Sequence, residues 1–512
     1  MRPFRRRLIT AALIVIVSAA VLLLAGGLVL SNILTKKVEE KLKASNASIG
    51  SLSINLFARS IRIRDLEYQG VKVNDIRASG IRIIKLLRDK RLSIRKINID
   101  NGSVLIQKDL KLSDSTASDS IPITGIDIDR LSINNIGVQV AKDTTIEYSA
   151  TVGFVFNHLA LDSMMAWRKP SAYTFKNLES FVKDLKIENW DDLYALKIKE
   201  ASFDKELMRL RIDSLELLPR VSKNDWGKKV KSQITRTTVL VGNILAEGVN
   251  MAVHLDDTTV MVSSVEIHGP SLHAYKDKRF PFTRKEKFLL PMDAFRKMDI
   301  GIEADTLRIH DGTITYEEFP VEGFHPAHIT FEGLEATMSS VNNRQLNNIE
   351  YSTLEASAHV MKTGEVKATF KLPMEKDKKY SAKGSITNVP LRELNPLLKD
   401  VVFIEISSGR LNKMNFSFTY DDLASQGELQ MDYEDLKILS LRKDKEGEIS
   451  AFKTLLVNTA VKNDETLTGN IAVARNQKKA VFNLWTMSLV DGIKNALMPR
   501  AVAKNAKKKN KN

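Results

Sequence analysis

Apolar and polar residues alternate with a period of two through most of this 512-residue chain. The alternation begins near residue 49 and recurs in short stretches such as residues 61–64 and 131–133. Successive side chains of a β-strand point to opposite faces, so each such strand has one apolar face and one solvated face. Charged or Ser-rich stretches, including residues 112–120 and 276–287, interrupt the alternation and are typical of loops. The pattern predicts a mostly β protein with few short helices.

A local motif, apolar–x–Ile–x–x–Gly–x–apolar, occurs at residues 97–104, 307–314 and 404–411, with a looser copy at 265–272. Its two apolar residues at spacing two predict a strand, and Asn-Gly or Asp-Gly supplies a turn with positive φ at low steric cost. We therefore predict repeated strand–turn–strand units. Their turn glycines would be Gly102, Gly312 and Gly409. An ordinary hairpin, which any all-β protein uses, accounts equally well for a single copy.

The apolar positions of these strands would together form one long apolar surface. The residues expected to line it are Ile61, Ile63, Val71, Val73, Ile97, Ile99, Val104, Ile106, Leu307, Ile309, Ile314, Ile404 and Ile406. Burying one such side chain is worth roughly 1.5–3 kcal/mol, whereas a typical domain is stable by only about 5–15 kcal/mol. The energetics therefore favour a filled or closed groove over a bare, wet one. Either acyl chains fill the groove or the sheet closes onto itself as a sandwich, and alternation alone does not separate the two.

The first 35 residues are predicted to form a membrane anchor. No charged side chain occurs from Leu8 to Thr35, and about 20 apolar residues suffice to cross a bilayer as a helix. A cleaved signal peptide, the alternative, has a shorter apolar region. Four arginines between residues 2 and 7 precede the segment and favour a cytoplasmic N-terminus. We expect a single-pass anchor with nearly the whole chain on the outer side of the membrane.

An amphipathic helix is expected near the C-terminus, over residues 481–498. Its apolar face would consist of Phe482, Trp485, Leu489, Ile493 and Leu497, which recur every three or four residues. Such a helix would cover the last sheet edge, which otherwise invites pairing with another chain. Docking on a partner or on a membrane surface is the alternative. The basic tail that follows, residues 504–511, is expected to be solvated, with weak attraction to lipid as the alternative.

The sequence carries little sign of catalytic or nucleic-acid chemistry. The formal charge is +15, but the Lys and Arg residues alternate with apolar residues as on the wet face of a sheet. Cysteine is absent, and no phosphate-binding loop, zinc-protease motif or nucleophile elbow occurs. Three pairs invite metal or acid–base chemistry: His325 with His328, His268 with His273, and Asp127 with Asp129. Loop histidines and a wet strand face are the simpler interpretations, so we predict no enzyme, no catalytic residue, no cofactor and no metal.

One N-terminal anchor followed by long alternating β resembles the AsmA-like superfamily of Gram-negative envelope proteins, close to its Bacteroidetes members. The most specific part of the resemblance is the C-terminal third. There a helical stretch from Pro390 to Leu398 precedes residues 404–411, a strand at 427–436 with Tyr-x-Asp-Leu, and a helix with Asn-Leu-Trp at 483–485. The superfamily is related to chorein-type bridge-like lipid transfer proteins.

The resemblance implies a long, curved, largely antiparallel β-sheet, a "β-taco", with an apolar inner groove. It implies an inner-membrane protein with a periplasmic body that carries phospholipid between membranes or supports outer-membrane assembly and envelope homeostasis. The expected domains are an anchor (1–35), a β-groove (36–389), a C-terminal AsmA-like β region (390–480), and a helix with a basic tail (481–512). Expected partners are membrane phospholipids, the inner membrane and envelope proteins, but not nucleic acid. An anchored adaptor with a closed β-sandwich core remains the alternative.

Overall fold

The computed structural model describes residues 48–55, 57–68, 70–107, 124–142, 145–161, 173–253, 258–344, 349–376, 378–443, 446–449 and 466–497. The chain is mostly β, with 66% strand and 12% helix, as the alternation predicts, and its sheet is mixed. The expected anchor and the basic tail lie outside the described residues. Within the described ranges, no helix is both long enough and apolar enough to cross a membrane.

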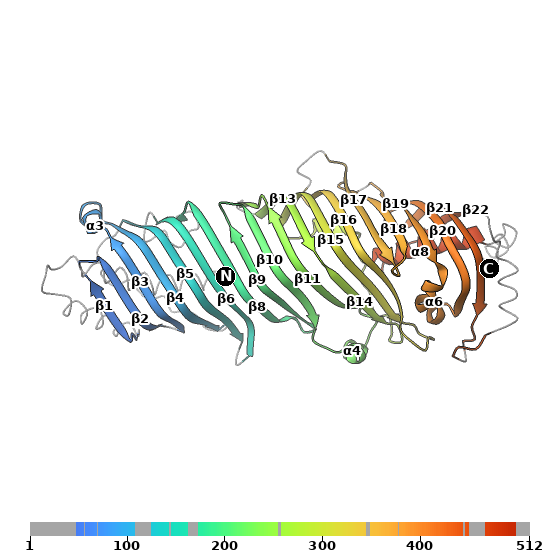
Figure 1. Ribbon diagram of the computed structural model, residues 1–512, viewed down its shortest axis with the longest axis horizontal. Coiled ribbons are helices and arrows are strands. Elements are labelled where there is room, and N and C mark those ends of the chain that lie inside the picture. Colours follow the sequence, from blue (N-terminus) through green and yellow to red (C-terminus); the bar gives the residue numbers. More distant parts are fainter. Residues whose placement is uncertain are drawn as a thin grey trace. The chain divides into compact units, whose positions relative to one another are not determined.

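The chain divides into two units, Met1–Leu215 and Glu216–Asn512. The elements of unit 1 are β1 (Ser51–Asn55), β2 (Ser60–Tyr68), β3 (Val71–Ile81), α3 (Ile83–Asp89), β4 (Arg91–Gln107), β5 (Gly125–Lys142), β6 (Thr145–Leu161), β7 (Tyr173–Thr174), β8 (Asn177–Asp191), β9 (Tyr194–Asp204) and β10 (Arg209–Pro219), which ends just past the boundary. From β1 to β4 each strand pairs antiparallel with the next, whereas β4 and β5 are parallel (Figure 1). β5 and β8 lie antiparallel on either side of β6, and β9 follows β8.

The elements of unit 2 are α4 (Lys223–Val230), β11 (Arg236–Glu247), β12 (Asn250–Val253), β13 (Thr258–His268), β14 (Ser271–Asp277), α5 (Pro291–Arg296), β15 (Gly301–Phe319), β16 (Ala327–Asn342), β17 (Tyr351–Val360), β18 (Gly364–Pro373), β19 (Tyr380–Pro390), the 3-10 helix η3 (Leu391–Leu394), α6 (Asn395–Val401), β20 (Ile404–Tyr420), β21 (Ala424–Ser440), β22 (Thr466–Ala474) and α8 (Val481–Leu497). Both β13 and β14 lie antiparallel to β11 and parallel to β15. From β15 to β22 each strand pairs antiparallel with the next.

The predicted strand–turn–strand units are wrong, because each of the three full motif copies lies within one continuous strand. Gly102 is inside β4, Gly312 inside β15 and Gly409 inside β20. In the looser copy, Gly269 separates β13 from β14, but the chain keeps its direction across it. The positive φ that the motif anticipates does occur in three of the strands, at 54° for Asn101, 52° for Asp311 and 128° for Gly409. It kinks the strand instead of reversing it.

The kink keeps one face of a long strand apolar when the apolar spacing changes. Ile99 and Val104 are five residues apart, so in a regular strand their side chains would point to opposite faces. The left-handed residue between them absorbs the odd spacing, and both Ile99 and Val104 are buried in the same core. Only glycine fits at Gly102, because a Cβ there would clash with the Lys72 carbonyl oxygen of β3.

Each unit has its own hydrophobic core. Unit 1 packs the apolar faces of β1–β5 together with Leu86 of α3. Unit 2 packs β17–β22 with α5 and with α8, which the periodicity predicted to within one residue (Figure 1). Leu484 of α8 is 3% exposed, and Gly492 approaches the side chains of Leu429 in β21 and Ile471 in β22. The helix thus covers a face of the sheet from β18, where Trp485 stacks on Phe370, to β22, and not only the last edge as the sequence predicted. Phe482, expected on the packed side, is 64% exposed.

Candidate functional site: half-buried apolar faces

A half-buried apolar surface extends over β6, β8 and β9 in unit 1. The register places Val152 beside Val182 and Val182 beside Ala201, so side chains from adjacent strands line up in rows. This unit 1 apolar face consists of Tyr148, Ala150, Val152, Phe154, Phe156, Leu178, Val182, Leu185, Ile187, Leu196, Ile198, Ala201 and Phe203. All of these residues are partly exposed, and none is fully buried.

The same side of the sheet is closed at β1–β5. There Ile63 is 1% exposed, Ile97 is 2% exposed and Ile133 is 5% exposed. Ile133 is the register partner of Phe154 of β6, so the change from buried to half-buried residues occurs between two hydrogen-bonded strands. Unit 1 therefore combines a closed core at β1–β5 with a partly exposed apolar surface on the strands that follow, where a ligand could bind.

Unit 2 repeats this arrangement. Its apolar face consists of Val265, Ile267, Leu272, Leu307, Ile309, Ile314, Phe331, Met338, Leu354, Ala356, Ala368 and Phe370, which align across β13–β18 and are all partly exposed. Towards β20–β22 the same rows become buried: Phe418 is 3% exposed and Leu429 is 0% exposed, where α8 packs.

The residues expected to line a groove fall into two environments. Ile61, Ile63, Val71, Val73, Ile97, Ile99 and Val104 are all 3% exposed or less and belong to the closed core of unit 1. Ile106 packs partly buried against that core. Leu307, Ile309 and Ile314 lie on the unit 2 apolar face, and Ile404 is partly exposed at the start of β20, whereas Ile406 is buried in the core with α8. The residues of the unit 1 apolar face are not among those that the sequence predicted to line a groove, although their strands show the same alternation.

Comparison with known proteins does not suggest a function for this chain. No family model matches the chain, and a search of curated proteins finds no match.

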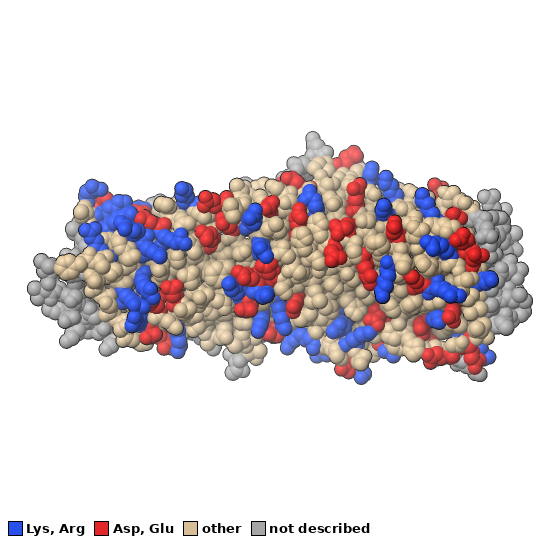
Figure 2. Space-filling model, in the orientation of Figure 1, with Lys and Arg blue, Asp and Glu red and all other residues tan. Residues whose placement is uncertain are grey.

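The opposite face of the sheet is polar and held by ion pairs. Asp127 and Asp129, considered above as a catalytic pair, lie on the wet side of β5 and bind different arginines: Arg91 at 2.8 Å and Arg82 at 2.5 Å. The hydrogen bond from Arg91 lowers the pKa of the Asp127 carboxyl, against the opposing effect of desolvation. Figure 2 shows Lys, Arg, Asp and Glu side chains interspersed over one face of the molecule. This face is stabilised by opposite charges and carries no free carboxylate dyad at β5.

Neither histidine pair of the sequence belongs to a cluster of three metal-ligating side chains among the described residues. His325 is exposed and contacts Glu446, whereas His328 is the second residue of β16. His268 and His273 occupy β13 and β14 instead of a loop.

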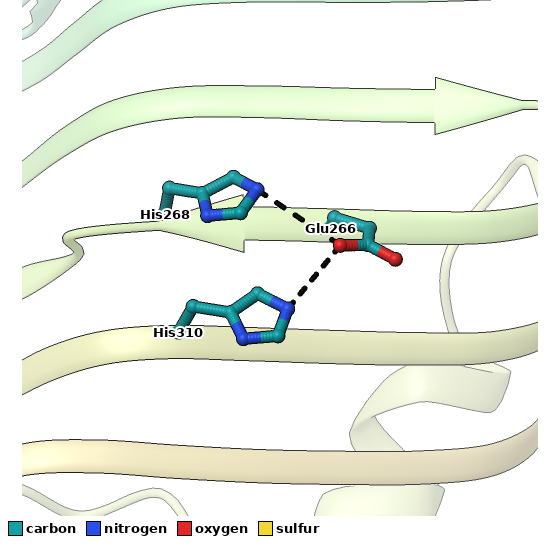
Figure 3. Close-up of side chains that lie close together, drawn as sticks. All are labelled: Glu266, His268 and His310. Atoms are coloured by element: carbon teal, nitrogen blue, oxygen red, sulfur yellow. Dashed lines mark hydrogen bonds and ion pairs between the residues drawn. The ribbon is translucent and has the colours of Figure 1, made fainter.

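His268 instead meets a residue that sequence reasoning missed, His310, with Glu266 between them (Figure 3). A signal was present, because His268 and His310 each directly follow the second apolar residue of a motif copy. Parallel pairing of β13 with β15 brings those two copies side by side.

Proposed function

We propose that this protein binds the acyl chains of phospholipids on its apolar faces and takes part in phospholipid transport between membranes, as an inner-membrane-anchored periplasmic protein. The observation that carries the proposal is the unit 1 apolar face, which stays partly exposed although the same side of β1–β5 is closed. Extended apolar patches of this kind are rare on soluble proteins and mark sites for lipid, membrane or protein.

The energy available from such a face is sufficient for lipid binding. Each CH₂ group removed from water contributes about 0.8 kcal/mol, so roughly ten methylenes contribute on the order of 8 kcal/mol before the cost of association is subtracted. Contacts of aliphatic and aromatic side chains recognise hydrocarbon and not a particular head group. We therefore expect loose selectivity among phospholipids, with the basic excess of the chain favouring anionic head groups.

The proposal is tested with Val182→Asp in the full chain, extracted without added lipid. Val182 lies on the unit 1 apolar face and is partly exposed, so a carboxylate there keeps access to water and the fold is retained. Phospholipid that co-purifies should fall at least several-fold, measured by mass spectrometry per mole of protein, with far-ultraviolet circular dichroism unchanged.

The matched control is Lys183→Asp, which introduces the same carboxylate one residue along β8, on the other face. Because it lies away from the apolar face, it should retain wild-type lipid. The same pair of positions can carry a photo-crosslinking amino acid, which should label phospholipid from position 182 and not from position 183. Equal lipid in both aspartate variants, or equal labelling from both positions, would contradict the proposal.

An adaptor role has one observation in its favour, the outward side of α8. Phe482 is 64% exposed and Met487 is 41% exposed, whereas the other side of the helix packs against the sheet. Under this alternative, Phe482→Ser abolishes the capture of an envelope protein by the full chain and leaves co-purifying lipid unchanged. Loss of lipid without loss of a protein partner would reject it.

A further inference from the structure

Three metal-ligating side chains converge on the polar face of unit 2. Glu266 and His268 project from β13 and His310 from the parallel neighbour β15, where His268 and His310 are register partners (Figure 3). Glu266 Oε2 lies 3.2 Å from His310 Nε2 and 3.9 Å from His268 Nε2. The two imidazole rings stack with centroids 4.8 Å apart. The three side chains are 31% to 49% exposed, so an ion can reach them from solvent.

Both ring nitrogens of His310 face a carboxylate oxygen, and either a second proton or a metal ion at Nε2 satisfies both contacts. Its Nδ1 lies 3.0 Å from Glu335 Oε2 and its Nε2 lies 3.2 Å from Glu266 Oε2. A neutral imidazole has one N–H, so it can donate to only one of these carboxylates. With that proton on Nδ1, the Nε2 lone pair faces a carboxylate oxygen. A metal ion placed between them turns this repulsion into two bonds.

Neighbouring groups orient each ligand for that purpose. Glu335 accepts from the backbone N–H of Asp311 at 2.8 Å through its other oxygen, which fixes the carboxylate that holds His310. Carboxylates that hold a ligating histidine in this way are typical of zinc sites. Arg308 donates to Oε1 of Glu266 at 3.0 Å and leaves Oε2 for the ion. The ligand set is therefore supported on two sides.

A residue with positive φ directly follows each of the two histidines, which are register partners on β13 and β15. Gly269 and Asp311, with φ of 60° and 52°, directly follow them, and the Gly269 N–H donates to the His310 carbonyl at 2.8 Å. Two ligands about 2.0–2.1 Å from a tetrahedral ion are about 3.4 Å apart, close to the observed 3.2 and 3.9 Å.

We propose that Glu266, His268 and His310 bind a divalent transition-metal ion, best fitted by Zn²⁺, with one coordination position left for water. Two imidazoles and one carboxylate suit Zn²⁺ better than Ca²⁺ or Mg²⁺, which prefer oxygen ligands. The ion would join β13 to β15 beside their kinks. This site departs from the sequence-based expectation of no metal, and it does not depend on lipid binding.

The test is calorimetric titration of Zn²⁺ into the full chain after removal of metal by a chelator. We expect one saturable site per chain. His268→Ala and His310→Ala should each weaken binding at least tenfold. Glu335→Gln, at a positioning residue, should weaken it about tenfold, as is usual when the partner of a ligating histidine is changed. The matched control is His273→Ala, on the adjoining strand β14, where the histidine pairs with Glu317. Its affinity for Zn²⁺ should equal that of the wild type.

Thermal unfolding supplies an independent readout, because an ion that binds only the folded chain raises the melting temperature. Zn²⁺ should raise it for the wild type and for His273→Ala, and not for the double variant His268→Ala/His310→Ala. The inference is overturned if the wild type shows no saturable binding. It is equally overturned if the double variant, with wild-type circular dichroism, binds Zn²⁺ as tightly as the wild type.

Discussion

Replacing Gly469 by alanine should separate α8 from the sheet that it covers. Gly469 of β22 lies against the backbone of α8. A Cβ there would clash with the Gly492 carbonyl oxygen and lie 2.6 Å from the Ala496 backbone nitrogen, whereas ordinary contact begins at 3.4 Å. To restore ordinary contact with Ala496 alone, the helix must move outward by 0.8 Å. Both partners in this contact are backbone, so no side chain can rotate out of the way.

The cost of Gly469→Ala follows from what α8 buries. If the core absorbs the shift, overpacking of this kind costs about 1–3 kcal/mol. If the helix leaves the sheet, Val481 and Leu484, now 8% and 3% exposed, also lose their burial. Each such side chain adds roughly 1.5–3 kcal/mol. The free energy of unfolding of unit 2 should therefore fall by at least about 1 kcal/mol.

Trp485 reports the displacement directly, because its ring stacks on Phe370 with centroids 4.6 Å apart. Urea unfolding followed by fluorescence should show an earlier transition and a red-shifted native emission for Gly469→Ala. Trp485→Phe variants with and without Gly469→Ala record the emission of the other tryptophans, which is subtracted to isolate the signal of Trp485. The control is Gly137→Ala in β5, where a Cβ would lie 3.6 Å from its nearest neighbour. If Gly469→Ala matches the wild type in both midpoint and emission, the close packing of α8 on β22 is refuted.

Three further predictions concern single contacts. Asp75, hydrogen-bonded by Arg62 at 2.8 Å, has a pKa below its usual value of about 3.9, chiefly because of that bond. Asp75→Asn should be less stable than the wild type at pH 7, and the gap between their urea midpoints should shrink as the pH falls below about 4, because the wild type then loses the ion pair on protonation. At Asn101, with φ of 54°, Asn101→Val should cost about 1–2 kcal/mol and Asn101→Gly almost nothing in thermal unfolding. The buried hydroxyls of Ser425 and Ser488 lie 2.6 Å apart. Because Ser488 donates its one hydrogen to the Leu484 carbonyl, Ser425 must donate to Ser488. Ser488→Ala should therefore cost about 1–3 kcal/mol, more than Ser425→Ala or the double variant by urea unfolding, because it leaves a buried donor unpaired.

Local patterns in the sequence determined the elements of this fold and their two-sidedness. Period-two alternation, as at Ile61 and Ile63, makes a strand with one apolar face whatever its neighbours are. The three-to-four spacing of Trp485, Leu489 and Ile493 specifies α8 in the same way. Positive φ near the motif glycines also followed from local chemistry, because Asn, Asp and Gly adopt that conformation at little cost.

Tertiary structure decided what these elements do together. Ile99 and Val182 alternate alike, yet one is 2% exposed in a core and the other is half-buried on the unit 1 apolar face. The backbone at Asn101 could reverse or kink a strand, and pairing with β3 on one side and β5 on the other selects the kink. His268 meets His310 only because β13 and β15 run parallel in register. Backbone preference and side-chain alternation act over a few residues, whereas burial and strand pairing depend on residues far apart in the chain, and no local pattern encodes which of these will be neighbours.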